Sequence, residues 1–189
     1  MPTAVLRLIF VIVLCPALIA PASVIAEPKL EMHRVGVNND DGSGWYPADS
    51  TKGSFSIRMP IPFNDFSTHD PSTGDASHVI GAKSSEGIKF SAVQSPVTAK
   101  TPADLAAIPQ SFSSNKANRV SDVSRNTRDG ADILSFSVAT SATTAHVRYI
   151  RTKATLYILT IEYPNAYRDV VADKRDKFFD SFKIKGKGA

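Results

Sequence analysis

Residues 131–163, which read ADILSFSVATSATTAHVRYIRTKATLYILTIEY, decide the fold. Three apolar segments with strand character, at 131–140, 144–153 and 155–163, are separated only by short polar joins. Joins of this length connect antiparallel strands, because a parallel connection needs a crossover of a dozen or more residues. The stretch therefore predicts an antiparallel meander.

The last of these strands, 155–163, is apolar on both of its faces. One face carries Leu156 and Ile158, and the other carries Tyr157, Leu159, Ile161 and Tyr163. A strand that is apolar on both sides is normally covered on both sides. We therefore expect this strand in the centre of a sheet, with helices packed on each face.

Two segments carry helix signals. Residues 101–104 (TPAD) combine a capping threonine, a proline that suits the first turn and an aspartate that suits the helix dipole. After Pro164, apolar residues recur at helical spacing as far as Phe182. Together with strand patterns elsewhere, these signals predict an α+β fold in which a central antiparallel sheet is flanked by helices on both faces.

The first 26 residues differ from the rest of the chain. Arg7 is their only charge, residues 8–14 are an unbroken apolar run, and Ala26 suits signal peptidase at the last position before a cleavage site. We therefore expect residues 1–26 to be a cleaved secretory signal peptide and residues 27–189 to form one domain. A retained anchor, or a lipoprotein acylated at Cys15, is the alternative.

Composition narrows the function of the mature domain. Its net charge, +4 for the whole chain, falls to +3 once Arg7 is lost, and the basic residues are evenly spread, which is not the pattern of a nucleic-acid-binding protein. The single cysteine is Cys15, so the mature domain has no disulfide and no thiol chemistry. We expect a monomer with no stable membrane span after cleavage, in a bacterial periplasm or secreted.

At both ends of residues 45–184 the sequence resembles exported PsbP-like proteins. Trp45-Tyr46-Pro47 followed by residues 53–60 (GSFSIRMP) resembles the entry of that family, and residues 178–184 (FFDSFKI) are similar to its final helix and strand. The resemblance implies the α/β/α sandwich that PsbP-like proteins share with the Mog-type Ran-binding factors. It also implies non-catalytic binding to larger protein assemblies, and no catalytic residues carry over.

Two loops contain side chains that can ligate metals. Residues 38–44 are rich in oxygen ligands, as calcium loops are, but they lack the alternating acids and distal glutamate of an EF-hand. His69, Asp70, Asp75 and His78 lie close together, yet their spacing matches no established zinc pattern. No nucleophile elbow or phosphate-binding glycine loop occurs. We therefore expect no catalytic, cofactor or metal residues.

The candidate ligand or partner patch consists of His146, Arg148, Trp45 and Tyr46. His146 and Arg148 share one face of the strand 144–153, where basic side chains can bind an anionic ligand. Trp45 and Tyr46 are an aromatic pair that can serve recognition or close over the core.

These observations predict an exported, non-catalytic binding or accessory protein of the bacterial cell envelope, with a partner protein there. The alternative is a periplasmic protein that binds a metal or small ligand, or acts as a weak hydrolase, through residues 38–44 and 69–78.

Overall fold

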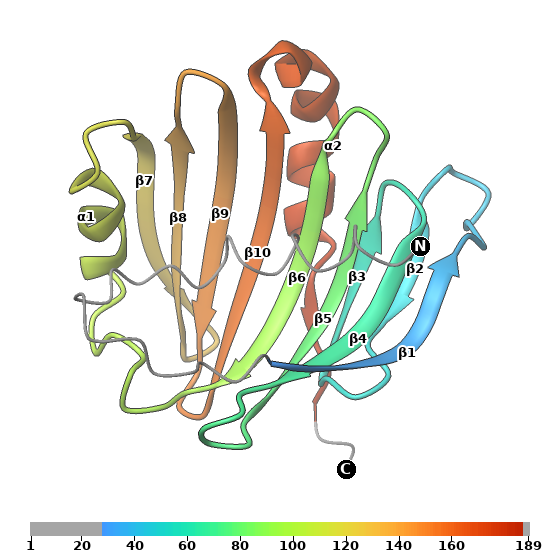
Figure 1. Ribbon diagram of the computed structural model, residues 1–189, viewed down its shortest axis with the longest axis horizontal. Helices are drawn as coiled ribbons and strands as arrows, with labels where there is room; N and C mark the ends of the chain where they lie inside the picture. Colours follow the sequence, from blue (N-terminus) through green and yellow to red (C-terminus); the bar gives the residue numbers. More distant parts are fainter. Residues whose placement is uncertain (1–27, 187–189) are drawn as a thin grey trace.

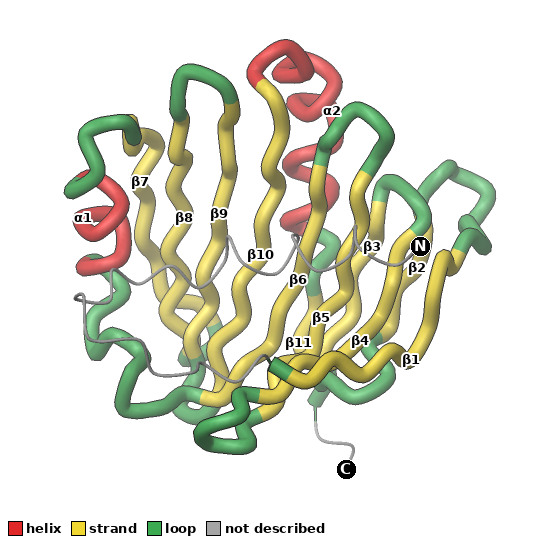
Figure 2. The backbone as a smooth tube through the Cα atoms, in the orientation of Figure 1, coloured by secondary structure: helices red, strands yellow, loops and turns green. Residues whose placement is uncertain are grey.

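The computed structural model describes residues 28–186, and strands dominate it (Figure 1, Figure 2). The predicted signal segment, residues 1–26, lies outside the described residues. Eight strands form one antiparallel sheet, in the spatial order β1 (Lys29–Val37), β4 (Phe63–His69), β5 (Ala76–Lys83), β6 (Lys89–Pro96), β10 (Thr155–Pro164), β9 (Thr143–Arg151), β8 (Ala131–Ala139) and β7 (Arg119–Arg128).

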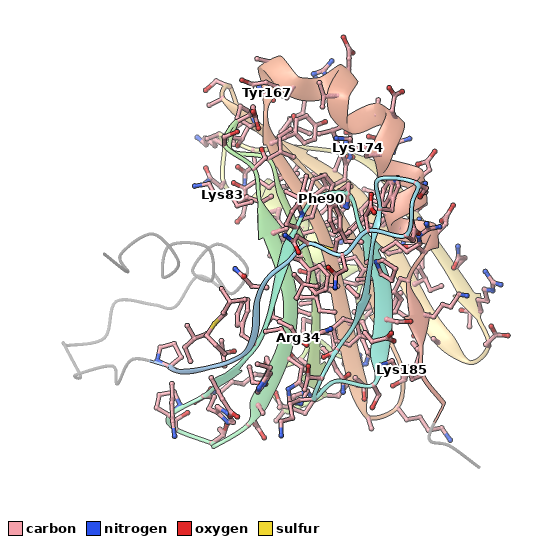
Figure 3. All side chains as sticks on the ribbon, turned by 90° about the vertical axis from the view of Figure 1, so that its right-hand side faces the viewer. Arg34, Lys83, Phe90, Tyr167, Lys174 and Lys185 are labelled. Carbon is pink, nitrogen blue, oxygen red and sulfur yellow. The ribbon has the colours of Figure 1, made fainter. Side chains whose placement is uncertain are left out.

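A smaller sheet and two helices complete the described fold. The smaller sheet has the order β11 (Lys183–Ile184), β3 (Phe55–Met59) and β2 (Tyr46–Asp49). The helices are α1 (Ala107–Ser113) and α2 (Arg168–Asp180), and a short 3-10 turn, η2 (Asn165–Tyr167), leads into α2. Figure 3 shows Tyr167 and Lys185 at opposite ends of the molecule, so α2 and β11 together run along the large sheet.

Strands β8, β9 and β10 form the antiparallel meander that residues 131–163 predict. Tyr157 pairs with Ile150, and Ile150 pairs with Ile133. Strand β10 is central, as predicted, because β6 pairs with its other edge. All of these pairs are antiparallel, and residues 140–142 and 152–154 form the short turns that join β8 to β9 and β9 to β10.

The main core lies on the face of β10 that carries Leu159 and Ile161. Both side chains are fully buried against α2 and β3, and Val171 and Phe178 of α2 are fully buried in the same cluster. The ring of Phe178 meets that of Phe90 from β6 edge-on, with 5.4 Å between the ring centroids. This apolar layer fixes α2 on the sheet.

A second core lies at one end of the opposite face. There Leu105 and Ile108, just before and within α1, pack with Leu134, Phe136 and Tyr149 of β8 and β9. The phenylalanine and tyrosine rings stack with 6.0 Å between centroids. Helix α1 has seven residues, so it covers only this end of the face.

The predicted sandwich, with helices flanking the sheet on both faces, is wrong. The protein is mostly β: one face is covered by a three-stranded sheet with one helix, and the other carries one short helix near an edge. The physical reason is that a strand apolar on both faces needs a cover but does not specify its type. Residues 46–59, which alternate as strands, supply part of the layer that was expected to be helical.

Candidate functional site

A pocket of about 320 Å³ lies where the β8–β9 turn meets the start of α2. Its lining residues are Ala117, Arg119, Ala139, Thr140, Ser141, Thr144, Asn165 and Arg168. They come from the chain entering β7, the β8–β9 hairpin, η2 and the first residue of α2. In Figure 1 the hairpin turn and the start of α2 lie at the same end of the molecule.

Asn165 holds the wall of this pocket in place. Its side-chain amide donates to the carbonyl oxygens of Thr140, at 3.2 Å, and Ser141, at 3.1 Å. Its Oδ1 accepts a hydrogen bond of 2.7 Å from the Thr144 hydroxyl, and its backbone N–H donates to the carbonyl of Ala142 at 2.9 Å. One residue thereby ties the hairpin turn to the helix start, so the pocket is formed before any ligand arrives.

Two arginines line the pocket, Arg119 and Arg168. Within residues 28–186, Arg119 and Arg168 have no ion pair and no hydrogen bond from the side chain. Every other described arginine has an acidic, hydroxyl or carbonyl partner; these are Arg34, Arg58, Arg125, Arg128, Arg148, Arg151 and Arg175. The two unpaired guanidinium groups therefore give the pocket a positive potential.

A chain of hydrogen bonds runs behind the pocket. His146 Nδ1 lies 2.8 Å from the Ser137 hydroxyl oxygen, and His146 Nε2 lies 3.0 Å from the Tyr163 hydroxyl oxygen. Thr144 lies on the same strand as His146 and donates to the pocket residue Asn165. The chain joins β9 to its two neighbours β8 and β10 through side chains.

The electrostatics of this chain favour neutral groups in its interior. Burial, followed by the charge of Arg175, lowers the pKa of His146. Burial also raises the pKa of Tyr163, which keeps its hydroxyl protonated. At the outer end, hydrogen bonds from Ser137 and Ser121 lower the pKa of Asp122. This aspartate has a backbone φ of 54° in the bulge of β7.

Arg148, from the predicted patch, makes contacts within the protein. Its Nη1 lies 3.3 Å from Asp180 Oδ1 on α2, and its Nε donates to the Ser135 hydroxyl at 3.3 Å. Its guanidinium carbon lies 4.8 Å from the ring centroid of Phe179. These contacts link the end of α2 to β9 and β8.

Trp45 and Tyr46 lie on the far side of α2, in and beside the small sheet. Trp45 is 8% exposed and belongs to the main core, with Lys177 Nζ 4.5 Å from its ring centroid. Tyr46 is half-buried and packs on the same core. Trp45 and Arg148 each contact a residue of α2, but the structure does not bring the aromatic pair together with His146 and Arg148.

The predicted patch omitted Arg119, Arg168 and Asn165. The sequence placed Arg119 on a strand and the other two at the start of a helix, but nothing in it indicated that these elements meet. A usable signal was Pro164-Asn165, because asparagine before a helix can bond to backbone groups of a neighbouring turn.

In the two loops that carry possible metal ligands, Asp70 and Asp41 already have partners within the protein. Asp70 accepts from the Ser72 hydroxyl and N–H, which lowers its pKa, and Asp41 pairs with Arg58. His78 bonds through Nδ1 to the Ser67 hydroxyl at 2.8 Å. Among residues 28–186, no group of three ligating side chains has the geometry to hold a metal ion.

Within the part of the chain that the structure describes, no helix is long and apolar enough to cross a membrane. Comparison with known proteins finds no family model and no curated protein that matches the chain.

Solved structures do show likeness. The chain is similar to the solution structure of cyanobacterial PsbP (CyanoP) from Synechocystis, with 12% identity, a TM-score of 0.44, and coverage of 75% of this chain and 93% of that one. It is also similar to LpqN, which is involved in cell envelope biogenesis of Mycobacterium tuberculosis, with 12% identity, a TM-score of 0.39 and coverage of 84% of each chain. The resemblance to PsbP-like proteins thus recurs between structures. Likenesses this distant concern the fold alone.

Proposed function

We propose that this is an exported, non-catalytic binding protein whose ligand site is the pocket between the β8–β9 turn and the start of α2. The observation that carries the proposal is a preformed pocket at which the donors of Arg119 and Arg168 have no partner within residues 28–186. A site whose walls are already fixed loses little conformational entropy on binding. Hydrogen-bond donors that have no partner in the protein can orient a ligand there.

The surroundings of His146 support a role in binding and not in catalysis. Both ring nitrogens meet hydroxyl groups, those of Ser137 and Tyr163, whereas a serine hydrolase needs a carboxylate to orient its histidine. Ser137 is 6% exposed, which keeps its hydroxyl away from a substrate. The imidazole instead links β9 to β8 and β10 through these two hydroxyl groups.

Export rests on the pattern of residues 1–26, with one basic residue ahead of an apolar run and a small residue at the cleavage position. The ligand is then expected in the cell envelope, free or as part of an envelope protein. The mass of the intact protein is measured after expression in a secretion-competent host. A mass that matches a chain starting at Met1 would contradict export with cleavage.

The binding proposal is tested by blocking the pocket. Purified protein is mixed with a panel of phosphate, sulfate, carboxylate and neutral sugar compounds, and the melting temperature is measured. A compound that binds only the folded state raises that temperature. We expect Ser141→Trp to abolish the rise, while the matched control Ser85→Trp, exposed in the β5–β6 turn, preserves it. No rise with any compound, or an equal rise in Ser141→Trp, would refute the proposal.

A further inference from the structure

The lining of the pocket has one sign of charge. Of its eight residues, two are arginines, four carry hydroxyl or amide groups and two are alanines, and none is acidic or aromatic. Neutral sugars and apolar ligands usually rest on aromatic or large apolar side chains. The lining therefore favours a polar anion.

We infer that the pocket binds a phosphate-class oxyanion, free or as a phosphate monoester, between Arg119 of β7 and Arg168 of α2. The inference rests on the proposed function and names the chemistry of its ligand. Each guanidinium presents a planar fork of N–H donors that suits phosphate or carboxylate oxygens. The two forks come from separate elements, so an ion between them is held from two directions.

Charge decides between phosphate and carboxylate. A phosphate monoester carries about −1.5 to −2 at neutral pH and has three acceptor oxygens, so it neutralises both arginines. A carboxylate has one charge and two oxygens, which leaves one guanidinium without an anion. Asp122 and Asp176 act on His146 from β7 and α2, but neither lines the pocket.

The size of the pocket leaves room for more than the ion. A volume of about 320 Å³ exceeds that of a bare phosphate, and the Ser141 side chain and two alanine methyl groups can meet a small carrier. Both a soluble phosphate monoester and a phospholipid headgroup present this chemistry. Co-sedimentation with phospholipid vesicles distinguishes the two sources.

Binding is measured by titration calorimetry at constant ionic strength, with inorganic phosphate, sulfate, acetate and glucose as probes. We expect phosphate and sulfate to bind, acetate to bind more weakly and glucose not to bind. Arg119→Gln and Arg168→Gln should each weaken phosphate binding by about 10-fold or more, the usual effect of losing a charge-assisted hydrogen bond. Arg168→Lys, which keeps the charge but loses the fork, should fall between the wild type and Arg168→Gln.

Arg128→Gln is the matched control, because Arg128 lies on the same strand, its side chain is 82% exposed and it pairs only with Asp129. Its phosphate affinity should equal that of the wild type. An equal loss of phosphate affinity in Arg128→Gln would show that phosphate is attracted by the overall charge of the protein, and it would overturn the inference. Acetate or glucose binding as tightly as phosphate would also overturn it, yet would leave the proposed binding function standing. Failure of every probe and of the whole compound panel would overturn both.

Vesicles identify the source of the phosphate. Protein that co-sediments with phosphatidate vesicles but not with phosphatidylcholine vesicles, in an Arg119-dependent manner, indicates a lipid headgroup. Phosphate binding without co-sedimentation indicates a soluble monoester. Each result supports the inference, whereas sedimentation that is unaffected by Arg119→Gln and Arg168→Gln contradicts it.

Discussion

Asn165 is the residue on which the shape of the pocket depends most. Its amide makes three hydrogen bonds, to Thr140, Ser141 and Thr144, and it is partly shielded from water. A neutral hydrogen bond contributes about 1 kcal/mol to stability, and the partners left behind here are partly exposed. Loss of the Asn165 side chain should therefore lower the stability of the protein by a measurable amount.

We predict that Asn165→Ala lowers the free energy of unfolding by about 1–3 kcal/mol and weakens ligand binding at the pocket. The first effect is measured by urea unfolding and the second by calorimetry with phosphate. Asn126→Ala, an exposed asparagine of β7, is the control and should change neither. Full stability and full binding in Asn165→Ala would contradict its role.

His146 makes stability depend on pH. Burial lowers its pKa in the folded protein from the ordinary value of 6.5, so the unfolded chain takes up its proton first as the pH falls. The unfolded state then binds more protons, and stability decreases from about pH 6.5 downward until the folded pKa is passed. His78 acts in the same direction, because burial also lowers its pKa.

We predict that the free energy of unfolding is lower at pH 5.5 than at pH 7.5, and that the difference shrinks in His146→Asn. It should shrink further in the double variant with His78→Asn. Urea unfolding at the two pH values measures each difference. An unchanged pH dependence in both variants would show that other groups cause it.

At the scale of elements, Asp65 fastens the edge strand β1 to the rest of the sheet. This aspartate of β4 is fully buried, and its Oδ2 accepts hydrogen bonds from Arg34 Nε at 3.1 Å and Nη2 at 2.9 Å. The same oxygen accepts from the N–H and hydroxyl of Thr51, at 2.9 and 2.6 Å, in the segment between β2 and β3. Arg34 also donates to the carbonyl of Asp49. One carboxylate thereby connects β1, β4 and the small sheet.

We predict that Asp65→Asn destabilises the protein by about 1.5–3 kcal/mol, because it leaves the partly exposed Arg34 guanidinium without its anion. The double variant with Arg34→Met should recover part of the loss, since no unpaired charge remains. Asp49→Asn, at an exposed ion pair with Lys185, is the control and should cost less than 1 kcal/mol. A loss in Asp65→Asn no larger than in this control would disprove the connection.

At the scale of the whole molecule, sequence patterns predicted how consecutive strands pair better than they predicted which elements cover the sheet. Alternation at 131–163 predicted the meander, because short turns allow only antiparallel pairing. The helical spacing after Pro164 predicted α2, because its apolar face must meet the core. The covering layer was mispredicted, because apolar residues specify burial and not the element that supplies it.

The same sequence patterns do not predict the candidate site. Arg119 and Arg168 are far apart in the sequence. They line one pocket because β7 lies at the sheet edge beside β8 and the start of α2 is tied to the β8–β9 turn. Trp45 and Arg148, by contrast, could be picked out by residue type alone, and in the structure both contact α2.

The central claim is that the pocket beside Asn165 is where the protein binds its ligand. The most direct test is an NMR titration of nitrogen-15-labelled protein with inorganic phosphate at constant ionic strength. We expect amide shifts concentrated at residues 117–119, 139–144 and 165–168, and their disappearance in the Arg119→Gln/Arg168→Gln double variant. Shifts spread over the surface, or the same shifts in the double variant, would contradict the claim.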